Sequence, residues 1–346
     1  MIGVAIIGAG NIGRIRANVI KNSRAARVCA VADLDFTRAQ ELARAADAQA
    51  IEEWKDAIRS PDVDVVIVAT PTKFHAEAIR ASLEAGKHVL CEKPLARSVR
   101  ETEMFSHLPE SSQLILKTGF NYRYMAHVRK AKDIVDSGAL GPVYFLRCHY
   151  GHGGRPGYEQ SWCTDLDLSG GGVLLEQGIH ILDLTRYLLG EPSQVLATDS
   201  RYFWNFAAVE DNSFLLLRTS VAQTAEIHVS WTQWVNLFSL ELLGRDGYLH
   251  LTGRDGHYGP QKLVWGKRQA NHGRPEEQTF EFSGHNDSWE LEWQDFVNAI
   301  QVRRQPMGNL SDGIRALELV EAAYKSSREQ KWIDVASKKT TVRSAA

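Results

Sequence analysis

The stretch VAIIGAGNIG at residues 4–13 joins an apolar run to a glycine-rich turn with the pattern G-x-G-x-x-G. A continuous apolar run is typical of a strand that is buried on both faces of a parallel sheet. In such a turn Gly8 permits a tight bend, Gly10 permits close approach of a pyrophosphate, and Gly13 permits a helix to pack closely on the strand. The stretch therefore predicts a strand, a turn and a helix around a dinucleotide.

The residues after the turn strengthen this prediction. Asn11 and Ile12 fall in the first turn of the expected helix, where free N–H groups and the positive dipole end favour an anion. A second apolar run at 28–32 ends at Asp33, twenty residues after Gly13. An acid at this distance is suited to the 2′-hydroxyl of an adenosine ribose. Its charge repels a 2′-phosphate, which favours NAD over NADP, although Arg38 lies near enough in sequence to soften that preference.

Composition limits the class of protein. A length of 346 residues suits two domains, and 44% hydrophobic with 24% charged residues is ordinary for a globular protein. The net charge of −2 gives no electrostatic reason to expect nucleic acid or an anionic membrane as a partner. The four cysteines are far apart, so we expect neither a disulfide framework nor a metal site. With a strand expected from residue 2 and no apolar run of spanning length, we expect a cytoplasmic protein.

Strand and helix signals alternate up to about residue 120. Further strands are expected at 63–69, 88–91 and 114–116, and helices at 36–48, 54–60, 75–85 and 98–107. Such alternation predicts a parallel sheet, which is typical of an α/β Rossmann domain at 1–120. The second part, 121–340, has strand-like runs in succession, which favours antiparallel pairing. These runs are 143–150, 195–204, 213–219, 224–231, 238–243 and 248–251, with helices at 123–136, 174–189, 289–302 and 312–327.

Polar residues follow the expected strands of the first part. Ligands of parallel sheets bind beyond the carboxyl ends of the strands, where Thr70, Glu92, Lys93 and Asn121 fall. Burial disfavours the charged form of lysine, so we expect a lowered pKa for Lys93 and a hydrogen bond from it to a reacting hydroxyl or carbonyl. The alternative is an ammonium group that only neutralises a cofactor phosphate or caps a turn.

A second group of polar residues lies at 176–183. Glu176, His180 and Asp183 follow a glycine run and are spaced to share one face of a helix. An imidazole between carboxylates is a general-base arrangement, because the ring takes up a proton near neutral pH and a carboxylate fixes its orientation. The alternative is a core histidine whose hydrogen bonds are satisfied.

These motifs together resemble the glucose–fructose oxidoreductase/inositol dehydrogenase (Gfo/Idh/MocA) family. The resemblance rests on the glycine turn, Pro71-Thr72 with His75, Glu92-Lys93-Pro94, and the glycine-rich lead into the helix with His180 and Asp183. The runs W-x-x-E-x-x-x-F from residue 289 and D-G-x-x-A-L from residue 312 fit the same family.

The resemblance implies a C-terminal α/β domain with an open, mostly antiparallel sheet, one face of which commonly forms a homodimer or homotetramer. It also implies NAD(P)-dependent hydride transfer at a secondary hydroxyl of a sugar, cyclitol or nucleotide-sugar. The family's lysine corresponds to Lys93 and its histidine to His180. Glu176 departs from the pattern, because the family often has Asp there.

We therefore expect His180 to act as the base, Lys93 as the hydrogen-bonding stabiliser and Glu176 as the orienting group. Two rival hypotheses remain: an enzyme that uses NAD transiently for elimination or glycoside cleavage, and a non-catalytic NAD-binding sensor. The residues expected at the cofactor are Gly8, Gly10, Asn11, Ile12, Gly13, Asp33, Arg38, Thr70, Pro71, His75, Glu92, Lys93 and Asn121. Those expected at the substrate are Arg123, Tyr124, His152, Arg155, Trp162 and Asp183.

Overall fold

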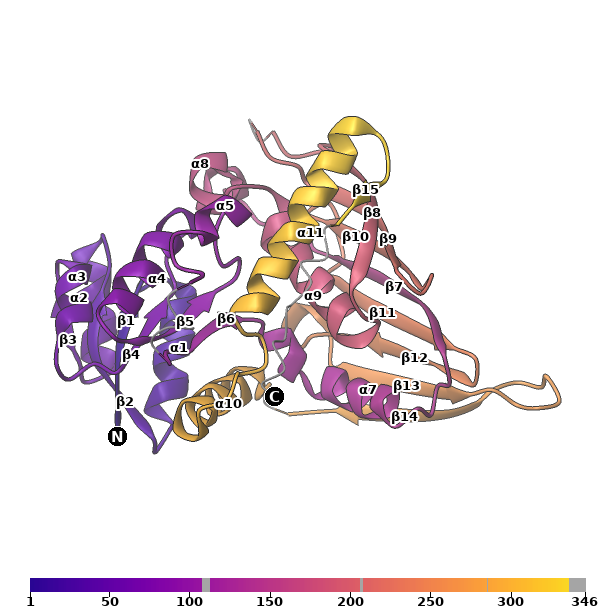
Figure 1. The fold of residues 1–346 in the computed structure, drawn as a ribbon, viewed down its shortest axis with the longest axis horizontal. Helices are drawn as coiled ribbons and strands as arrows, with labels where there is room; N and C mark the ends of the chain where they lie inside the picture. The colour runs from indigo at the N-terminus through magenta and orange to yellow at the C-terminus, as the bar shows by residue number, and fades with distance from the viewer. Residues whose placement is uncertain (108–112, 206–207, 285, 336–346) are drawn as a thin grey trace, which may run out of the picture.

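Two sheets form the framework of the computed structural model, which describes residues 1–107, 113–205, 208–284 and 286–335 (Figure 1). The first sheet has the strand order β3-β2-β1-β4-β5-β6 and the second the order β14-β13-β12-β11-β7-β10-β9-β8-β15. In Figure 1 the first sheet lies at the left, the second at the right, and helix α11 (Leu310–Glu329) runs between them. The α/β class expected from the sequence is confirmed.

The first sheet is entirely parallel. Its strands β1 and β4 are fully apolar, and every residue of β4 is 0% exposed, as befits a central strand covered on both faces. Its strands are β1 (Ile2–Ile7), β2 (Ala26–Ala32), β3 (Gln49–Ile51), β4 (Val65–Val68), β5 (His88–Glu92) and β6 (Leu116–Gly119). The intervening helices are α1 (Asn11–Lys21), α2 (Phe36–Ala45), α3 (Trp54–Arg59), α4 (His75–Glu84) and α5 (Val99–Thr102).

The sequence missed the short edge strand β3 and overestimated the helix at 98–107. That helix ends at Thr102, and residues 103–107 form turns. Residues 108–112 lie outside the described residues.

The register of the first sheet brings the ends of its strands together. Ile7 of β1 pairs with both Ala32 of β2 and Val68 of β4, and Val68 in turn pairs with Cys91 of β5. Because all strands point the same way, the residues after them emerge at one edge of the sheet. Gly8, Asp33, Thr70, Lys93 and Asn121, which follow five of these strands, therefore lie along one edge.

The second sheet is mostly antiparallel, with one exception at its centre. Strand β7 pairs with β11 in antiparallel fashion but with β10 in parallel fashion, for example at Cys148 and Ile227. Parallel neighbours need a crossover, and residues 152–191 supply it through helices α8 (Leu166–Ser169) and α9 (Ile179–Leu188). The mostly antiparallel sheet that the resemblance implies is therefore confirmed, with β7 and β10 as its parallel pair.

The second sheet is also larger than the sequence indicated. Strands β13 to β15 were not expected, because their residues are largely polar, and β14 is mostly exposed. The strands are β7 (Val143–Gly151), β8 (Pro192–Ser200), β9 (Asn212–Thr219), β10 (Thr224–Ser230), β11 (Leu237–Gly244), β12 (Gly247–Thr252), β13 (Gln261–Lys267), β14 (Glu276–Phe282) and β15 (Ile333–Asp334).

Helices from late in the chain bind the two parts together. Helix α10 (Ser288–Val302) buries Trp293 and Phe296 in a core cluster with Val4 and Ile6 of β1. Helix α11 packs along β8, where its Ser326 hydroxyl accepts a 2.9 Å hydrogen bond from the Ala197 amide. The first helix of the second part, α7 (Ala126–Asp136), follows β6 and packs on β13.

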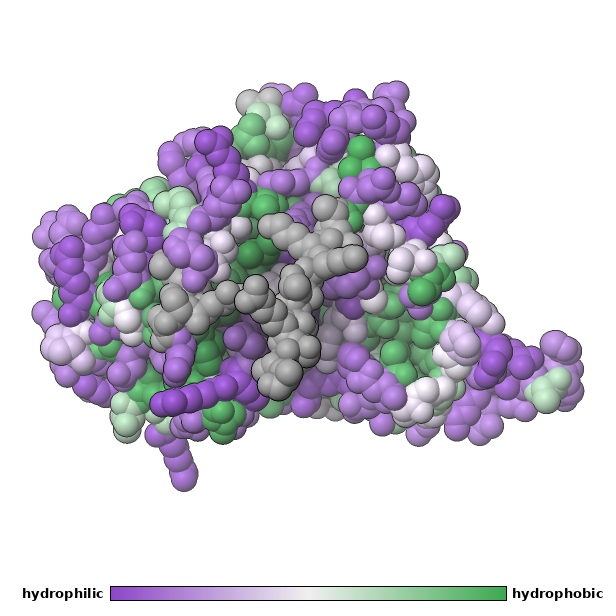
Figure 2. All heavy atoms as spheres, in the orientation of Figure 1, coloured by the Kyte–Doolittle hydropathy of each residue, from purple (hydrophilic) through white to green (hydrophobic). Residues whose placement is uncertain are grey.

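The surface differs between the two parts. Figure 2 shows a mostly hydrophilic surface over the first sheet, whereas hydrophobic residues gather over β7, β11 and β12. None of the described helices is long and apolar enough to cross a membrane. All four cysteines are free thiols, and within the described ranges no three histidine, cysteine or acidic side chains are grouped to hold a metal ion.

Candidate active site

The glycine turn has the geometry that its sequence predicts. Gly8 has a φ of 103°, and a Cβ there would meet the carbonyl oxygen of Ala69 at 2.4 Å. A Cβ at Gly13 would lie 2.0 Å from the Gly8 oxygen, so helix α1 packs on the strand as closely as glycine allows. By contrast, a Cβ at Gly10 would meet nothing within 4 Å. The turn therefore leaves open space beside Gly10, at the N-terminus of α1.

Asp33 lies directly after β2, beside this turn. Its Oδ2 accepts a 2.6 Å hydrogen bond from the Ala9 amide, and its Oδ1 accepts one of 2.9 Å from the Asp35 amide. The carboxylate is thus held at the edge where a ribose would lie. Arg38 is exposed on α2 and forms an ion pair with Asp35 at 3.1 Å, so its charge is already partly balanced.

The loop after β4 carries a hydroxyl that has no hydrogen-bond partner in the described part of the chain and a histidine that is buried. The Thr70 hydroxyl is buried and has no hydrogen-bond partner among the described residues. The ring nitrogens of His75 lie 2.8 Å from the Pro94 oxygen and 2.9 Å from the Thr70 oxygen, and the ring is 1% exposed. His75 therefore joins the loops that follow β4 and β5. The sequence predicted a cofactor contact for His75, but its ring is buried between these loops.

Glu92 is turned away from the cleft in the same way. Its Oε1 accepts a 2.7 Å hydrogen bond from Nε of Arg16 on α1, and Arg16 also pairs with Glu292 of α10 at 2.7 Å. Arg16 is 1% exposed and Glu292 is 0% exposed. Asn121, 4% exposed, donates from Nδ2 to the Ser288 hydroxyl at 3.4 Å. Arg16, which Glu92 holds in place, therefore joins the N-terminal part to α10.

Lys93 and Glu176 form the ion pair at the centre of the site. The Lys93 Nζ donates to Oε1 of Glu176 at 2.9 Å and to the Glu176 carbonyl oxygen at 2.6 Å. Burial alone would lower the pKa of Lys93, but the Glu176 carboxylate outweighs it and raises that pKa above its ordinary value. The expected lowering of the Lys93 pKa is therefore wrong, because a carboxylate pairs with the ammonium group. Lys93 is a charged donor.

Glu176 lies on the π-helical segment η5 (Leu174–Gly178), which continues directly into α9. A π-turn shifts the side chains that a regular helix would stack, and such turns are frequent at functional sites. Burial opposes the ionised form of Glu176, but Lys93 outweighs it and the pKa of the carboxyl falls below its usual range. Glu176 is therefore ionised at neutral pH.

His180 lies one turn further on, against an aromatic ring. The ring of Tyr122 stacks on the imidazole with centroids 3.8 Å apart and 4° between the planes. Neither ring nitrogen of His180 is hydrogen-bonded to another described residue, and Nδ1 is buried. Burial, and then the charges of Lys93 and Arg254, hold the pKa of His180 well below its ordinary value. A neutral imidazole near an ammonium group is able to accept a proton.

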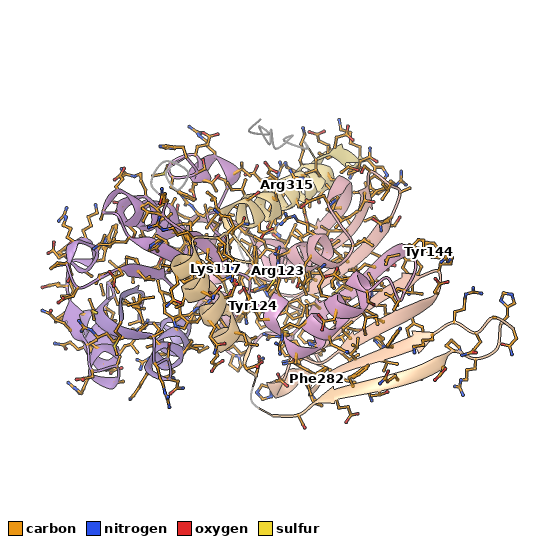
Figure 3. The ribbon with its side chains drawn as sticks, turned by 60° about the horizontal axis from the view of Figure 1, so that its bottom comes forward. Lys117, Arg123, Tyr124, Tyr144, Phe282 and Arg315 are labelled. Atoms are coloured by element: carbon orange, nitrogen blue, oxygen red, sulfur yellow. The ribbon has the colours of Figure 1, made fainter. Side chains whose placement is uncertain are left out.

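Three residues expected at the substrate lie elsewhere. Asp183 receives two hydrogen bonds from Arg123, at 2.8 and 2.6 Å, and Arg123 also binds Asp312. Tyr124 is 3% exposed and its hydroxyl donates to Asp295 at 2.7 Å. Figure 3 shows Arg123 and Tyr124 with Lys117 in the middle of the molecule, where the two parts meet. These side chains satisfy one another in the interior, so Asp183 neither orients His180 nor reaches a substrate.

The loop after β7 carries the remaining predicted substrate residues. His152 is half-buried, and its Nδ1 accepts a 2.9 Å hydrogen bond from the Gly154 amide. Burial lowers the pKa of His152, opposed by the nearby charge of Glu176. Arg155 is exposed, and Trp162, on a 3-10 turn, is 40% exposed. His152 thus lies near the ion pair, and the other two lie on the outer part of the loop.

No prediction from the sequence covered three aromatic and basic residues of the site, Tyr122, Arg254 and Tyr258. Tyr122 follows β6 in the 3-10 helix η2 (Asn121–Tyr124), and its hydroxyl shares a 2.6 Å hydrogen bond with that of Tyr150 on β7. Arg254 and Tyr258 come from the turn between β12 and β13, and Arg254 lies over the Tyr258 ring at 4.4 Å. Only the neighbouring Asn121 gave a signal for Tyr122, and nothing local marked the turn at 254–258.

Comparison with known proteins identifies the family. The family description "Oxidoreductase family, NAD-binding Rossmann fold" matches residues 2–120, and "GFO/IDH/MocA C-terminal domain" matches residues 128–250. The chain belongs to the Gfo/Idh/MocA oxidoreductase family. As a member of that family, it carries an NAD-binding Rossmann domain.

Individual members of the Gfo/Idh/MocA family resemble the chain over different lengths. Inositol 2-dehydrogenase of Rhizobium meliloti is 28% identical over 342 residues, covering 96% of this chain and 98% of that protein. Myo-inositol 2-dehydrogenase of Thermotoga maritima is 30% identical over 197 residues, 57% of this chain and 57% of that protein. In two further relatives the aligned region is about half of the protein's length or less, at 55% and 39%.

A solved structure from the same family shows the shared fold. Levoglucosan dehydrogenase in complex with NADH and L-sorbose superposes with a TM-score of 0.88 at 23% identity, covering 97% of this chain and 99% of that one. The fold is thus shared with that enzyme, and the two family matches confirm the resemblance expected from the sequence.

The strand-end cleft of this Gfo/Idh/MocA protein fits a dinucleotide. Asp33 shares its edge of the sheet with the open space at Gly10 and the uncapped N-terminus of α1. Thr70, whose buried hydroxyl has no hydrogen-bond partner among the described residues, follows β4 at the same edge. Helix N-termini bind phosphate through free N–H groups, and carboxylates bind ribose hydroxyls. Bound NAD supplies the hydride acceptor, and the residues that would hold it are those of the glycine turn together with Asp33 and Thr70.

Proposed function

We propose that this protein is an NAD-dependent dehydrogenase that removes hydride from a secondary hydroxyl of a sugar or cyclitol. The observation that carries this proposal is the meeting of a charged Lys93 and a neutral His180 beyond the strand ends. Lys93 is close enough to lower the pKa of His180, and Glu176 holds the ammonium group through two hydrogen bonds. A proton acceptor and a charged donor are the two groups that oxidation of an alcohol requires.

In this mechanism each residue has one task. His180 takes the hydroxyl proton, Lys93 donates a hydrogen bond to the oxygen as negative charge develops, and Glu176 orients Lys93. The flat contact with Tyr122 fixes the plane of the imidazole. A nucleotide-sugar satisfies the same chemistry, with its sugar hydroxyl placed between Lys93 and His180.

A panel of polyols, free sugars and nucleotide-sugars with NAD, followed by NADH absorbance, tests the proposal. Substituting Lys93→Ala or His180→Ala should lower kcat about 10²- to 10⁴-fold while leaving NAD affinity within a few-fold. Matched controls are Lys21→Ala, at the exposed C-terminal end of α1, and His272→Ala, at an exposed position between β13 and β14. Near-normal turnover in either site variant would contradict the assignment. Product formed without NADH accumulation would favour transient redox chemistry instead.

We also propose that the chain forms a homodimer or homotetramer through the outer face of the second sheet. Residues of β9 alternate between buried and exposed, and the outward Phe214 and Leu216 are 37% and 39% exposed. Exposed apolar side chains beside charged ones, here the Arg147–Glu226 pair on the neighbouring strands, are suited to a subunit interface.

Light scattering tests the oligomer. Leu216→Glu should dissociate it, whereas Val221→Glu, in the turn after β9 and 74% exposed, should not. A monomeric wild type would contradict this part of the proposal. We propose a cytoplasmic location on the basis of the four free thiols, which cell fractionation tests.

A further inference from the structure

The turn between β12 and β13 presents an arginine to the candidate active site. The Arg254 guanidinium carbon lies 4.4 Å from the Tyr258 ring centroid, 5.2 Å from that of Tyr122 and 5.7 Å from that of Tyr150. Tyr122 is the ring that stacks on His180. Arg254 is therefore connected to the proposed base through one aromatic ring, although 74 residues separate them in sequence.

The turn that carries Arg254 is tightly fixed. The amides of Arg254 and Asp255 both donate to the Gly259 carbonyl, at 3.2 and 2.8 Å. Gly253 has a φ of 76°, and a Cβ there would lie 2.0 Å from the Pro260 oxygen. Asp255 has a φ of 66°, which is uncommon for a residue with a side chain. Such backbone strain is often retained where a side chain must be held in one position.

Arg254 has no ion pair of its own among the described residues, although its charge acts on the Glu176 carboxylate. Its Nε is buried without a hydrogen-bond partner in the same part of the chain. The adjacent carboxylate, Asp255, instead accepts a 2.5 Å hydrogen bond from Gln261 Nε2. Three tyrosine rings stabilise the cation only in part, because a cation over an aromatic ring gains less than one in a buried ion pair.

The other charges of the site balance Arg254 only in part. Glu176 is shared between two cations, since it is hydrogen-bonded to Lys93 and also feels the charge of Arg254. Both His152 and His180 have lowered pKa values, caused first by burial. Arg155, on the loop beside His152, adds a second positive charge at the mouth. The site as a whole thus carries excess positive charge on its substrate side.

We propose that Arg254 binds an oxyanion substituent of the substrate, so that the preferred substrate is a sugar acid or a sugar phosphate. This inference rests on the proposed dehydrogenase function. A planar guanidinium forms two parallel hydrogen bonds with a carboxylate or phosphate, which combines charge balance with a fixed orientation. The hydroxyl to be oxidised would then lie at Lys93 and His180 while the anionic group lies at Arg254.

Matched substrates distinguish this inference from a neutral-sugar dehydrogenase. We would compare kcat/KM for D-glucose, D-glucuronate and D-glucose 6-phosphate, and for D-galactose and D-galacturonate. The wild type should favour the anionic member of at least one pair by about 10- to 100-fold, mainly through KM. The uronate and phosphate arms separate the two possible sources of the oxyanion.

Variants at Arg254 test whether this residue causes the preference. Arg254→Gln should abolish it and Arg254→Lys should retain part of it, because lysine keeps the charge but loses the two-pronged geometry. The control is Arg245→Gln, at an exposed arginine paired with Asp246 in another turn of the same sheet. Thermal unfolding of each variant checks that the loss of the tyrosine contacts has not unfolded the protein.

A binding measurement keeps the inference separate from the proposed function. Calorimetric titration of glucuronate, glucose 6-phosphate and glucose into the protein with NADH requires no turnover. Tighter binding of an anion that Arg254→Gln removes supports the inference, even if no sugar is oxidised. A preference for neutral sugars, or an anion preference unchanged in Arg254→Gln, overturns the inference while leaving the dehydrogenase function in place.

Discussion

The phenol ring of Tyr122 lies flat on the imidazole of His180, with 3.8 Å between their centroids. Because neither nitrogen of His180 is hydrogen-bonded to another described residue, this contact is what fixes the orientation of the ring. A base that is misplaced by about 1 Å loses about 100-fold in rate. The stacked Tyr122 ring therefore fixes the orientation of the His180 imidazole, a role that the sequence had assigned to a carboxylate.

We predict that Tyr122→Leu lowers kcat about 10- to 100-fold, because the imidazole is free to turn. Tyr122→Phe keeps the stacked ring and loses only the hydrogen bond to Tyr150, so its kcat should stay within a few-fold of wild type. Steady-state kinetics with NAD at saturation measure both. Equal losses in the two variants would show that the hydroxyl matters and the stacking does not.

The Lys93–Glu176 ion pair predicts a change in pH dependence. In Glu176→Gln the carboxylate that raises the Lys93 pKa is gone, and burial should then lower that pKa below its ordinary value. Activity should then fall at alkaline pH, where the wild type stays active, because a neutral lysine no longer stabilises negative charge. Glu176→Asp keeps a carboxylate and should retain most of the wild-type profile. Superimposable profiles of wild type and Glu176→Gln would rule out this role.

The lowered pKa of His180 predicts where activity is lost in acid. Burial, Lys93 and Arg254 all disfavour the charged ring, so His180 stays neutral well below pH 6.5, the ordinary histidine pKa. The kcat/KM profile should be flat from about pH 8 to about pH 6.5 and fall only below that. Arg254→Gln removes one positive charge, which should raise the His180 pKa and move the acid limb upward. An acid limb centred at or above pH 6.5 in the wild type would contradict the assignment.

Asp33 should determine the choice between the two nicotinamide cofactors. We expect wild-type kcat/KM to favour NAD strongly over NADP, and Asp33→Ala to narrow the ratio by about 10-fold or more. Asp62→Ala, an exposed acid before β4 at the opposite edge of the sheet, serves as the control. A wild type that prefers NADP would refute the role given to Asp33.

The Arg123–Asp183 pair should matter for stability and not for substrate binding. Asp183→Asn leaves the Arg123 guanidinium, 5% exposed, with only Asp312 as a carboxylate partner. Breaking a buried ion pair in this way should cost about 3 kcal/mol of unfolding free energy, measured in urea. The KM of the folded variant should stay near the wild-type value, and a KM raised tenfold at unchanged stability would return Asp183 to the substrate site.

The sequence was most informative where local pattern and three-dimensional position coincide. The apolar runs ending at Gly8, Asp33 and Lys93 predicted both the strands and the edge at which a ligand lies, because all strands of a parallel sheet end at one edge. It was least informative where a charged residue has a distant partner. Arg123 and Asp183 looked like ligands because nothing in the local pattern shows that they meet.

Arg254 was missed for a related reason. It reaches the site only because β7 lies between β10 and β11 and because the β12–β13 turn is bent, neither of which is visible in one stretch of sequence. The domain division at residue 120 stays a prediction.

The place of helix α10 has a consequence for how the chain is made. Trp293 and Phe296 complete the core that Val4 and Ile6 begin, and Glu292 closes the buried ion pair with Arg16. When only the first 120 residues have been synthesised, the apolar side chains that α10 covers are therefore still exposed, and Arg16 still lacks Glu292 as a partner. The N-terminal part completes its core only after nearly three hundred residues have been synthesised. Until then, its exposed apolar side chains are a surface that a chaperone can bind.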